Sequence, residues 1–127
     1  MTQTRRQASG AEAEAAAERF LTGKGLHTVA RNYQCRSGEI DLVMLDCSEP
    51  DEEVLVFVEV RFRPHDAMVS AVETVDERKQ RKLIQAARHF LMTRTEFEEH
   101  PCRFDVIGVE CLEDEPNWVA NAFETTT

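Results

Sequence analysis

The chain lacks the long apolar stretches and the cysteine patterns that mark membrane proteins and disulfide-bonded proteins. No apolar run approaches the roughly 20 residues needed to span a bilayer, and the polar N-terminus Met1–Gly10 does not resemble a signal peptide. The four cysteines include no Cys-x-x-Cys pair and fall in or beside strand-like segments. We therefore expect buried, reduced thiols rather than disulfides or zinc ligands, in a soluble cytoplasmic protein without membrane association.

The sequence also lacks internal repeats and low-complexity linkers. A chain of 127 residues with 42% hydrophobic content suits one compact domain around a single core. We predict that residues 10–127 form this domain and that residues 1–9 form a flexible N-terminal segment.

Basic residues are fewer than acidic ones. Fifteen basic residues against 24 acidic ones give a net charge of −9, which opposes non-specific attraction to nucleic acid. The distribution of charge matters more than its sum, because a basic face can bind phosphate on an acidic protein. Basic residues gather in the middle of the chain, and five of them form the candidate nucleic-acid surface: Arg78, Lys79, Arg81, Lys82 and Arg88.

Hydrophobic periodicity and turn residues predict an α/β protein. The third strand is apolar without alternation, which indicates a central strand covered on both faces. Residues 46–53 contain Pro50 and are expected to form a hairpin loop. The predicted order is a helix at 11–22, a short edge strand at 26–33, strands at 39–45 and 54–62, a helix at 75–93, a strand at 103–110, and a short strand or helix at 118–123. Lys79 falls on the apolar arc of the second helix, one turn before Leu83.

Two carboxylates interrupt the most apolar segments, Gly38–Val43 and Val56–Arg61. Burial of unpaired Asp41 and Glu59 would be costly, so each needs a neutralising partner. A hairpin register that pairs the two strands could place Asp41 beside Glu59. Two carboxylates with a backbone carbonyl and waters suit Mg²⁺, and a metal-activated water suits phosphodiester hydrolysis.

Purely structural roles are the alternative to a metal site and a phosphate-binding surface. The two carboxylates could instead form structural ion pairs with Arg31, Arg36, Arg61 or Arg103, and sequence alone gives this alternative equal weight. The basic stripe of the second helix is more often a solvated face than a phosphate-binding surface. Glu14 lies at the edge of the apolar sector of the first helix, where periodicity alone favours an ordinary boundary residue.

The chain resembles the YraN-like family of bacterial proteins and, more distantly, the archaeal Holliday-junction resolvases of the PD-(D/E)XK nuclease superfamily. The resemblance covers about Gly10 to Phe123. It rests on Gly10, Glu14 and Ala17, Arg31-Asn32, Gly38-Glu39-Ile40-Asp41-Leu42, Val56-Phe57-Val58-Glu59-Val60-Arg61, Lys79, Arg103-Phe104-Asp105-Val106, and Ala122-Phe123.

The resemblance implies a restriction-endonuclease-like sandwich of order αβββαβ, with a central mixed sheet flanked by helices. It implies a catalytic site in which Asp41 and Glu59 bind Mg²⁺ or Mn²⁺, Glu14 reaches the metal or its water, and Arg61 occupies the position of the superfamily lysine. By analogy it also implies DNA as a partner and a homodimer. Glu39, one residue before Asp41, is expected to be structural.

Two departures from the superfamily pattern stand out. Arg61 replaces a lysine and cannot lose its proton to act as a base. The loop after Arg63 lacks the Phe-Gly pair of many relatives and contains Asp66-Ala67-Met68-Val69-Ser70 instead. We therefore expect one of two functions. The first is a metal-dependent endonuclease acting on DNA, including branched or repair intermediates. The second is an inactive nuclease-fold module that binds nucleic acid or a protein partner.

Overall fold

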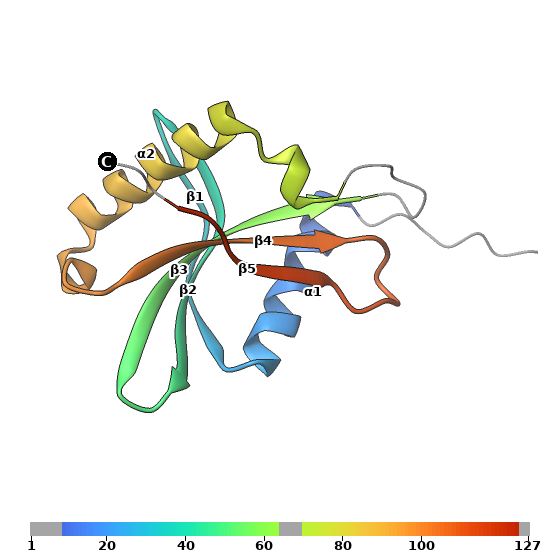
Figure 1. Cartoon of the computed structure of the whole chain (residues 1–127), viewed down its shortest axis with the longest axis horizontal. Coiled ribbons are helices and arrows are strands. Elements are labelled where there is room, and N and C mark those ends of the chain that lie inside the picture. Colours follow the sequence, from blue (N-terminus) through green and yellow to red (C-terminus); the bar gives the residue numbers. More distant parts are fainter. Residues whose placement is uncertain (1–8, 64–69, 125–127) are drawn as a thin grey trace, which may run out of the picture.

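We describe the fold from a computed structural model, which covers residues 9–63 and 70–124. The expected flexible segment before Ser9 and most of the loop after Arg63 lie outside the described residues. Two α-helices and five strands occur in the described part of the chain (Figure 1). They are α1 (Gly10–Gly23), β1 (Leu26–Cys35), β2 (Gly38–Glu49), β3 (Glu52–Phe62), α2 (Glu77–Thr93), β4 (Cys102–Val109) and β5 (Asn117–Phe123), with short 3₁₀ turns at Val72–Thr74 and Thr95–Phe97.

The strands form one mixed sheet in the order β1-β2-β3-β4-β5. Only the β3–β4 pair is parallel, and α2 lies in the crossover between these two strands. Parallel neighbours need such a crossover because a short turn cannot reverse the chain twice. The predicted α/β architecture and its αβββαβ order are thus confirmed, and β1 is the edge strand expected from its sequence.

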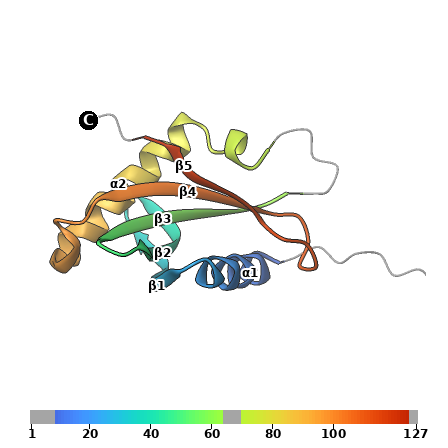
Figure 2. The same cartoon turned by 60° about the horizontal axis from the view of Figure 1, so that its bottom comes forward.

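The two helices lie on opposite faces of the sheet (Figure 2). Small and apolar residues of α1, including Ala17 and Leu21, pack on one face against Met44 and Val56. The opposite face packs against α2 through the residues Phe57, Leu83, Ala87, Phe90 and Phe104. β3 is therefore covered on both sides, which explains its uninterrupted apolar sequence.

Both helices begin at well-formed caps. Ser9 and Glu12 form a reciprocal capping box at the start of α1. The Asp76 side chain accepts a hydrogen bond from the Lys79 backbone N–H and caps α2. Gly25, with φ of 99°, follows α1 and makes the left-handed turn into β1 that residues with a Cβ rarely adopt.

The expected hairpin loop at residues 46–53 differs from the structure. β2 runs to Glu49 and β3 starts at Glu52, so the expected eight-residue hairpin loop shrinks to a tight turn at Pro50-Asp51. Polar side chains can continue an exposed hairpin because one face of these residues meets water. The ambiguous C-terminal element is a strand.

The cysteines are less buried than expected. None of the four cysteines, all of which lie in the described ranges, forms a disulfide; Cys111 is buried, Cys35 and Cys47 are half-buried, and Cys102 is exposed. Among residues 9–63 and 70–124, none of the helices is both long enough and apolar enough to cross a membrane.

Candidate metal and phosphate site

The candidate site lies where β2 and β3 separate. The antiparallel ladder between them extends to Leu42↔Val58, and one further step places Asp41 opposite Glu59. Beyond this point β2 continues along β1, while β3 continues along β4 (Figure 1). The hairpin register expected from sequence is confirmed, and the resulting fork leaves backbone groups that the ladder no longer satisfies.

The Asp41 side chain bridges the fork. Its Oδ2 accepts a hydrogen bond of 2.7 Å from the backbone N–H of Val60. Period two would place Ile40 and Leu42 on one face, yet Ile40 packs on the α2 side and Leu42 on the α1 side. The strand is therefore irregular between Ile40 and Leu42, and the Asp41 side chain reaches the backbone of β3.

The partner strand is irregular at the same level. Asn32 lies opposite Asp41 in the β1–β2 register and has a left-handed backbone with φ of 51°. Asparagine tolerates this conformation better than most residues, because its short polar side chain can form local hydrogen bonds. No sequence pattern predicted this irregularity, although Arg31-Asn32 belongs to the family resemblance.

Glu59 is the most perturbed carboxylate of the site. It is 5% exposed. Burial, and next the negative charge of Asp41, raise its pKa from 4.5 to about 7. Asp41 also has a raised pKa, caused first by burial, while the Val60 N–H and a hydrogen bond with Glu59 act in the opposite direction. The two carboxylates thus share a proton more readily than they carry two charges.

Two cations approach Glu59 from its own face of the sheet. Arg61 Nε lies 3.0 Å and Lys79 Nζ lies 3.6 Å from Glu59 Oε2. The Arg61 Nε is buried and has no hydrogen-bond partner, so its short distance to Glu59 is an ion pair without a directed N–H···O bond. An unsatisfied donor of this kind costs free energy and is available to a ligand.

Helix α1 contributes Glu14 at the other side of the fork. Burial, followed by the charge of Asp41, raises the pKa of Glu14, and a hydrogen bond from Asn32 opposes that rise. Glu39 is exposed and accepts a 3.4 Å hydrogen bond from Gln34 Nε2. Its charge still acts on Asp41 and Glu14, so the surroundings of the site are more acidic than the expected pair alone.

The donor set fits a divalent cation with few protein ligands. No group of three or more His, Cys, Asp and Glu side chains in the described ranges converges as a ready-made metal cluster. Asp41 and Glu59 are the two carboxylates that lie together, and the charge of Asp41 also acts on Glu14. Mg²⁺ commonly binds through one or two carboxylates and retains several waters, so this pair suits Mg²⁺ or Mn²⁺.

The five predicted phosphate-binding cations do not form one group. Lys79 is half-buried at the carboxylate site, whereas Arg78, Arg81, Lys82 and Arg88 are exposed on α2. Sequence reasoning placed Lys79 on the apolar arc of the helix, one turn before Leu83, and that position was the signal for its inward direction. Its contact with Glu59 depends on how α2 crosses the sheet, which periodicity does not define.

Two of the other arginines considered as structural partners pair elsewhere. Arg31 binds Glu18. Arg103 bridges Asp46 and the fully buried Asp105, and Asp105 also accepts hydrogen bonds from Trp118 Nε1 and the Asn121 backbone N–H. Asp105 thus has a structural role, and Arg61 pairs with Glu59 at the candidate site.

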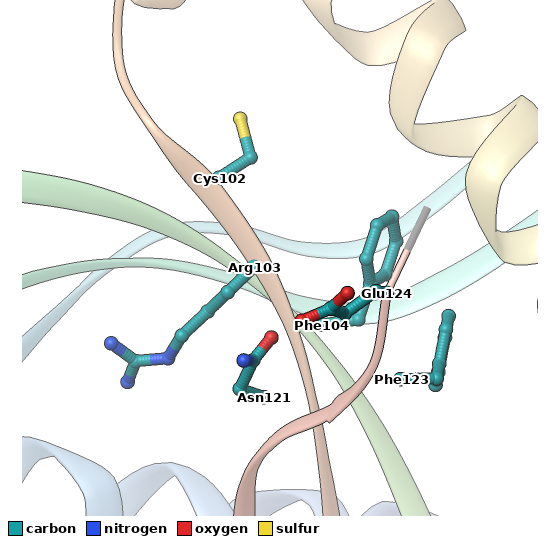
Figure 3. Close-up of a pocket in the computed structure, with 6 residues that line it drawn as sticks. All are labelled: Cys102, Arg103, Phe104, Asn121, Phe123 and Glu124. Atoms are coloured by element: carbon teal, nitrogen blue, oxygen red, sulfur yellow. The ribbon is translucent and has the colours of Figure 1, made fainter. Parts of the chain in front are cut away.

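A separate hollow of about 290 Å³ lies at the β4–β5 edge (Figure 3). Arg103 and Asn121 project on one side of β4, whereas Phe104 lies on the other. The Arg103 charge is already matched by Asp46 and Asp105, and Phe104 stacks on Phe123 with ring centroids 4.9 Å apart. This hollow contains none of the predicted site residues, and its arginine is already paired.

Comparison with known proteins places the chain in a family. Residues 13–109 match the family described as "Uncharacterised protein family UPF0102". A UPF0102 protein of Stutzerimonas stutzeri is 49% identical over 121 residues, covering 94% of this chain and 97% of the relative. A second one, from Pseudomonas savastanoi, is 46% identical over 128 residues, covering 98% and 100%. The chain therefore belongs to the UPF0102 family.

Proposed function

We propose that this protein is a Mg²⁺- or Mn²⁺-dependent endonuclease of the restriction-endonuclease-like, PD-(D/E)XK type that acts on DNA. The observation that carries the proposal is the juxtaposition of Asp41 and Glu59 at the β2–β3 fork, with Arg61 and Lys79 beside them. Two mutually repelling carboxylates favour a cation, and nearby cationic donors favour an anionic substrate.

The residues have distinct parts in this chemistry. A bound divalent ion would lower the pKa of a water and neutralise charge on the phosphate. Asp41 and Glu59 hold that ion, and the Val60 N–H keeps Asp41 oriented. Glu14 orients a water on the α1 side. Arg61 and Lys79 stabilise the negative charge that grows on the phosphate oxygens.

DNA is the proposed substrate class, and α2 supplies the contact surface. Arg78, Arg81, Lys82 and Arg88 are exposed along the same helix that delivers Lys79 to the site. Phosphates bound along α2 would therefore continue towards the carboxylates. The resemblance to resolvases extends the proposal to branched or repair intermediates and to a homodimer.

The second candidate function is an inactive nuclease-fold module that binds nucleic acid or a protein. One observation favours it: Glu59 already contacts two cations, so the site can be neutralised without metal. In that case the carboxylates and cations form a structural ion-pair network.

Cleavage of labelled linear, flapped and four-way DNA in Mg²⁺ or Mn²⁺ separates the two functions. The wild type should cut at least one substrate, Asp41→Asn should not, and the exposed-residue control Glu98→Gln should match the wild type. A wild type that binds DNA but leaves all three substrates intact in both metals would refute the endonuclease and favour the binding module.

A further inference from the structure

The position of Lys79 differs from that of every other cation on α2. It lies in the first turn, where its own backbone N–H is fixed by the Asp76 cap at 2.9 Å. Its side chain is 33% exposed, and Nζ lies 3.6 Å from Glu59 Oε2. Its positive charge also acts on Asp41, so Lys79 lies near both carboxylates. A capped first turn holds the Cα firmly while the four-carbon side chain remains adjustable.

Arg61 differs from Lys79 in geometry. It follows Glu59 by two residues on β3, and its side chain is 30% exposed with an unsatisfied, buried Nε. The planar guanidinium of arginine can donate hydrogen bonds to two phosphate oxygens at once, and its charge is delocalised over the whole group. It is suited to hold a phosphate, whereas a compact ammonium is suited to concentrate charge at one oxygen.

We propose that Lys79 from α2 provides the ammonium group of the reaction centre, and that Arg61 on β3 instead binds the scissile phosphate. This inference rests on the proposed nuclease function. The lysine expected two residues after Glu59 would then be replaced from a different element, because Lys79 reaches the same carboxylate oxygen that Arg61 contacts.

The step is a hydrolysis that needs only water. The water oxygen forms a bond to phosphorus while the bond from phosphorus to the leaving sugar oxygen breaks. One proton leaves the water for solvent, and solvent returns a proton to the leaving oxygen. Lys79 donates a hydrogen bond to the attacking oxygen as negative charge develops there, while Arg61 donates to the non-bridging oxygens.

The test measures kcat and KM for Lys79→Met, Lys79→Gln, Lys79→Arg and Arg61→Ala on the DNA that the wild type cleaves. Lys79→Met and Lys79→Gln should lower kcat about 100-fold, the usual cost of one preorganised donor, with KM within about threefold. Lys79→Arg should recover part of kcat because it restores the charge. Arg61→Ala should mainly raise KM. Lys24→Met, at the end of α1, is the matched control and should behave as wild type.

Each outcome bears on a different claim. If the wild type cleaves and the Lys79 variants keep kcat within about threefold, the assignment of Lys79 is wrong while the nuclease function stands. A kcat loss confined to Arg61→Ala would reverse the two roles. A wild type that is inert on every substrate overturns both proposals. Two Lys79 variants of different polarity, each checked for Mn²⁺ binding, separate a loss of catalysis from a loss of folding.

Discussion

Replacement of Glu59 by glutamine removes the charge that the fold tolerates least. Glutamine has the same shape as a protonated glutamate, so Glu59→Gln imitates the neutral form. Burial and Asp41 raise the pKa of Glu59 from 4.5 to about 7. In metal-free protein we therefore expect Glu59→Gln to be about as stable as the wild type near pH 5 and more stable at pH 8.

The sign follows from proton linkage. Between pH 4.5 and 7 the folded wild type keeps a proton on Glu59 that the unfolded chain has lost. Stability therefore falls as pH rises through this window and levels off above it. The shift corresponds to about 3 kcal/mol, which for a domain of this size is a difference of roughly 10 °C in Tm at pH 8.

Thermal and urea unfolding of both proteins from pH 5 to pH 8, in chelator, measure this difference directly. Glu98→Gln, an exposed substitution on the same chain, controls for the loss of one negative charge. Saturating Mg²⁺ should stabilise the wild type at pH 8 and leave Glu59→Gln unchanged. If Glu59→Gln is instead the less stable protein at pH 8, the ion pairs with Arg61 and Lys79 satisfy the charged carboxylate and the reasoning is wrong.

Two further changes test other parts of the account. Arg103→Met leaves Asp46 and the buried Asp105 without their shared cation, so chemical unfolding should show a loss of about 3 kcal/mol with Mn²⁺ binding intact; a neutral result would contradict the structural role of this pair. Joint replacement of Arg81 and Lys82 by glutamate should weaken DNA binding at low salt and reduce its salt dependence, as measured by fluorescence anisotropy. Unchanged binding would place the DNA surface elsewhere.

The fold followed from the sequence where burial dictates a pattern. The continuous apolar run of β3 predicted its central position, and the edge position of β1 was also expected, because each strand must match the environment on both of its faces. The hairpin turn was placed less well because residues 48–49 and 52–53 are polar and exposed and the buried residue before them is the charged Asp46, so the sequence shows no apolar alternation there.

The site was predictable only as a set of candidates. Asp41 and Glu59 stood out because carboxylates are costly in apolar strands. The hydrogen bond from the Val60 backbone N–H to Asp41 could not be read from the period-two pattern, because it depends on how β2 and β3 separate. The contact of Lys79 with Glu59 joins residues from different elements, and only the packing of α2 on the sheet establishes it.

Isothermal titration of Mn²⁺ tests the central claim, a divalent-cation site at the β2–β3 fork, most directly. Titrations should be run on the wild type, Asp41→Asn, Glu59→Gln and the control Glu98→Gln at pH 8, where the Glu59 carboxylate is largely charged. We predict saturable binding to the wild type and to Glu98→Gln, and its loss in Asp41→Asn and Glu59→Gln. Equal binding to all four proteins, or no binding to the wild type at millimolar Mn²⁺, would contradict the account.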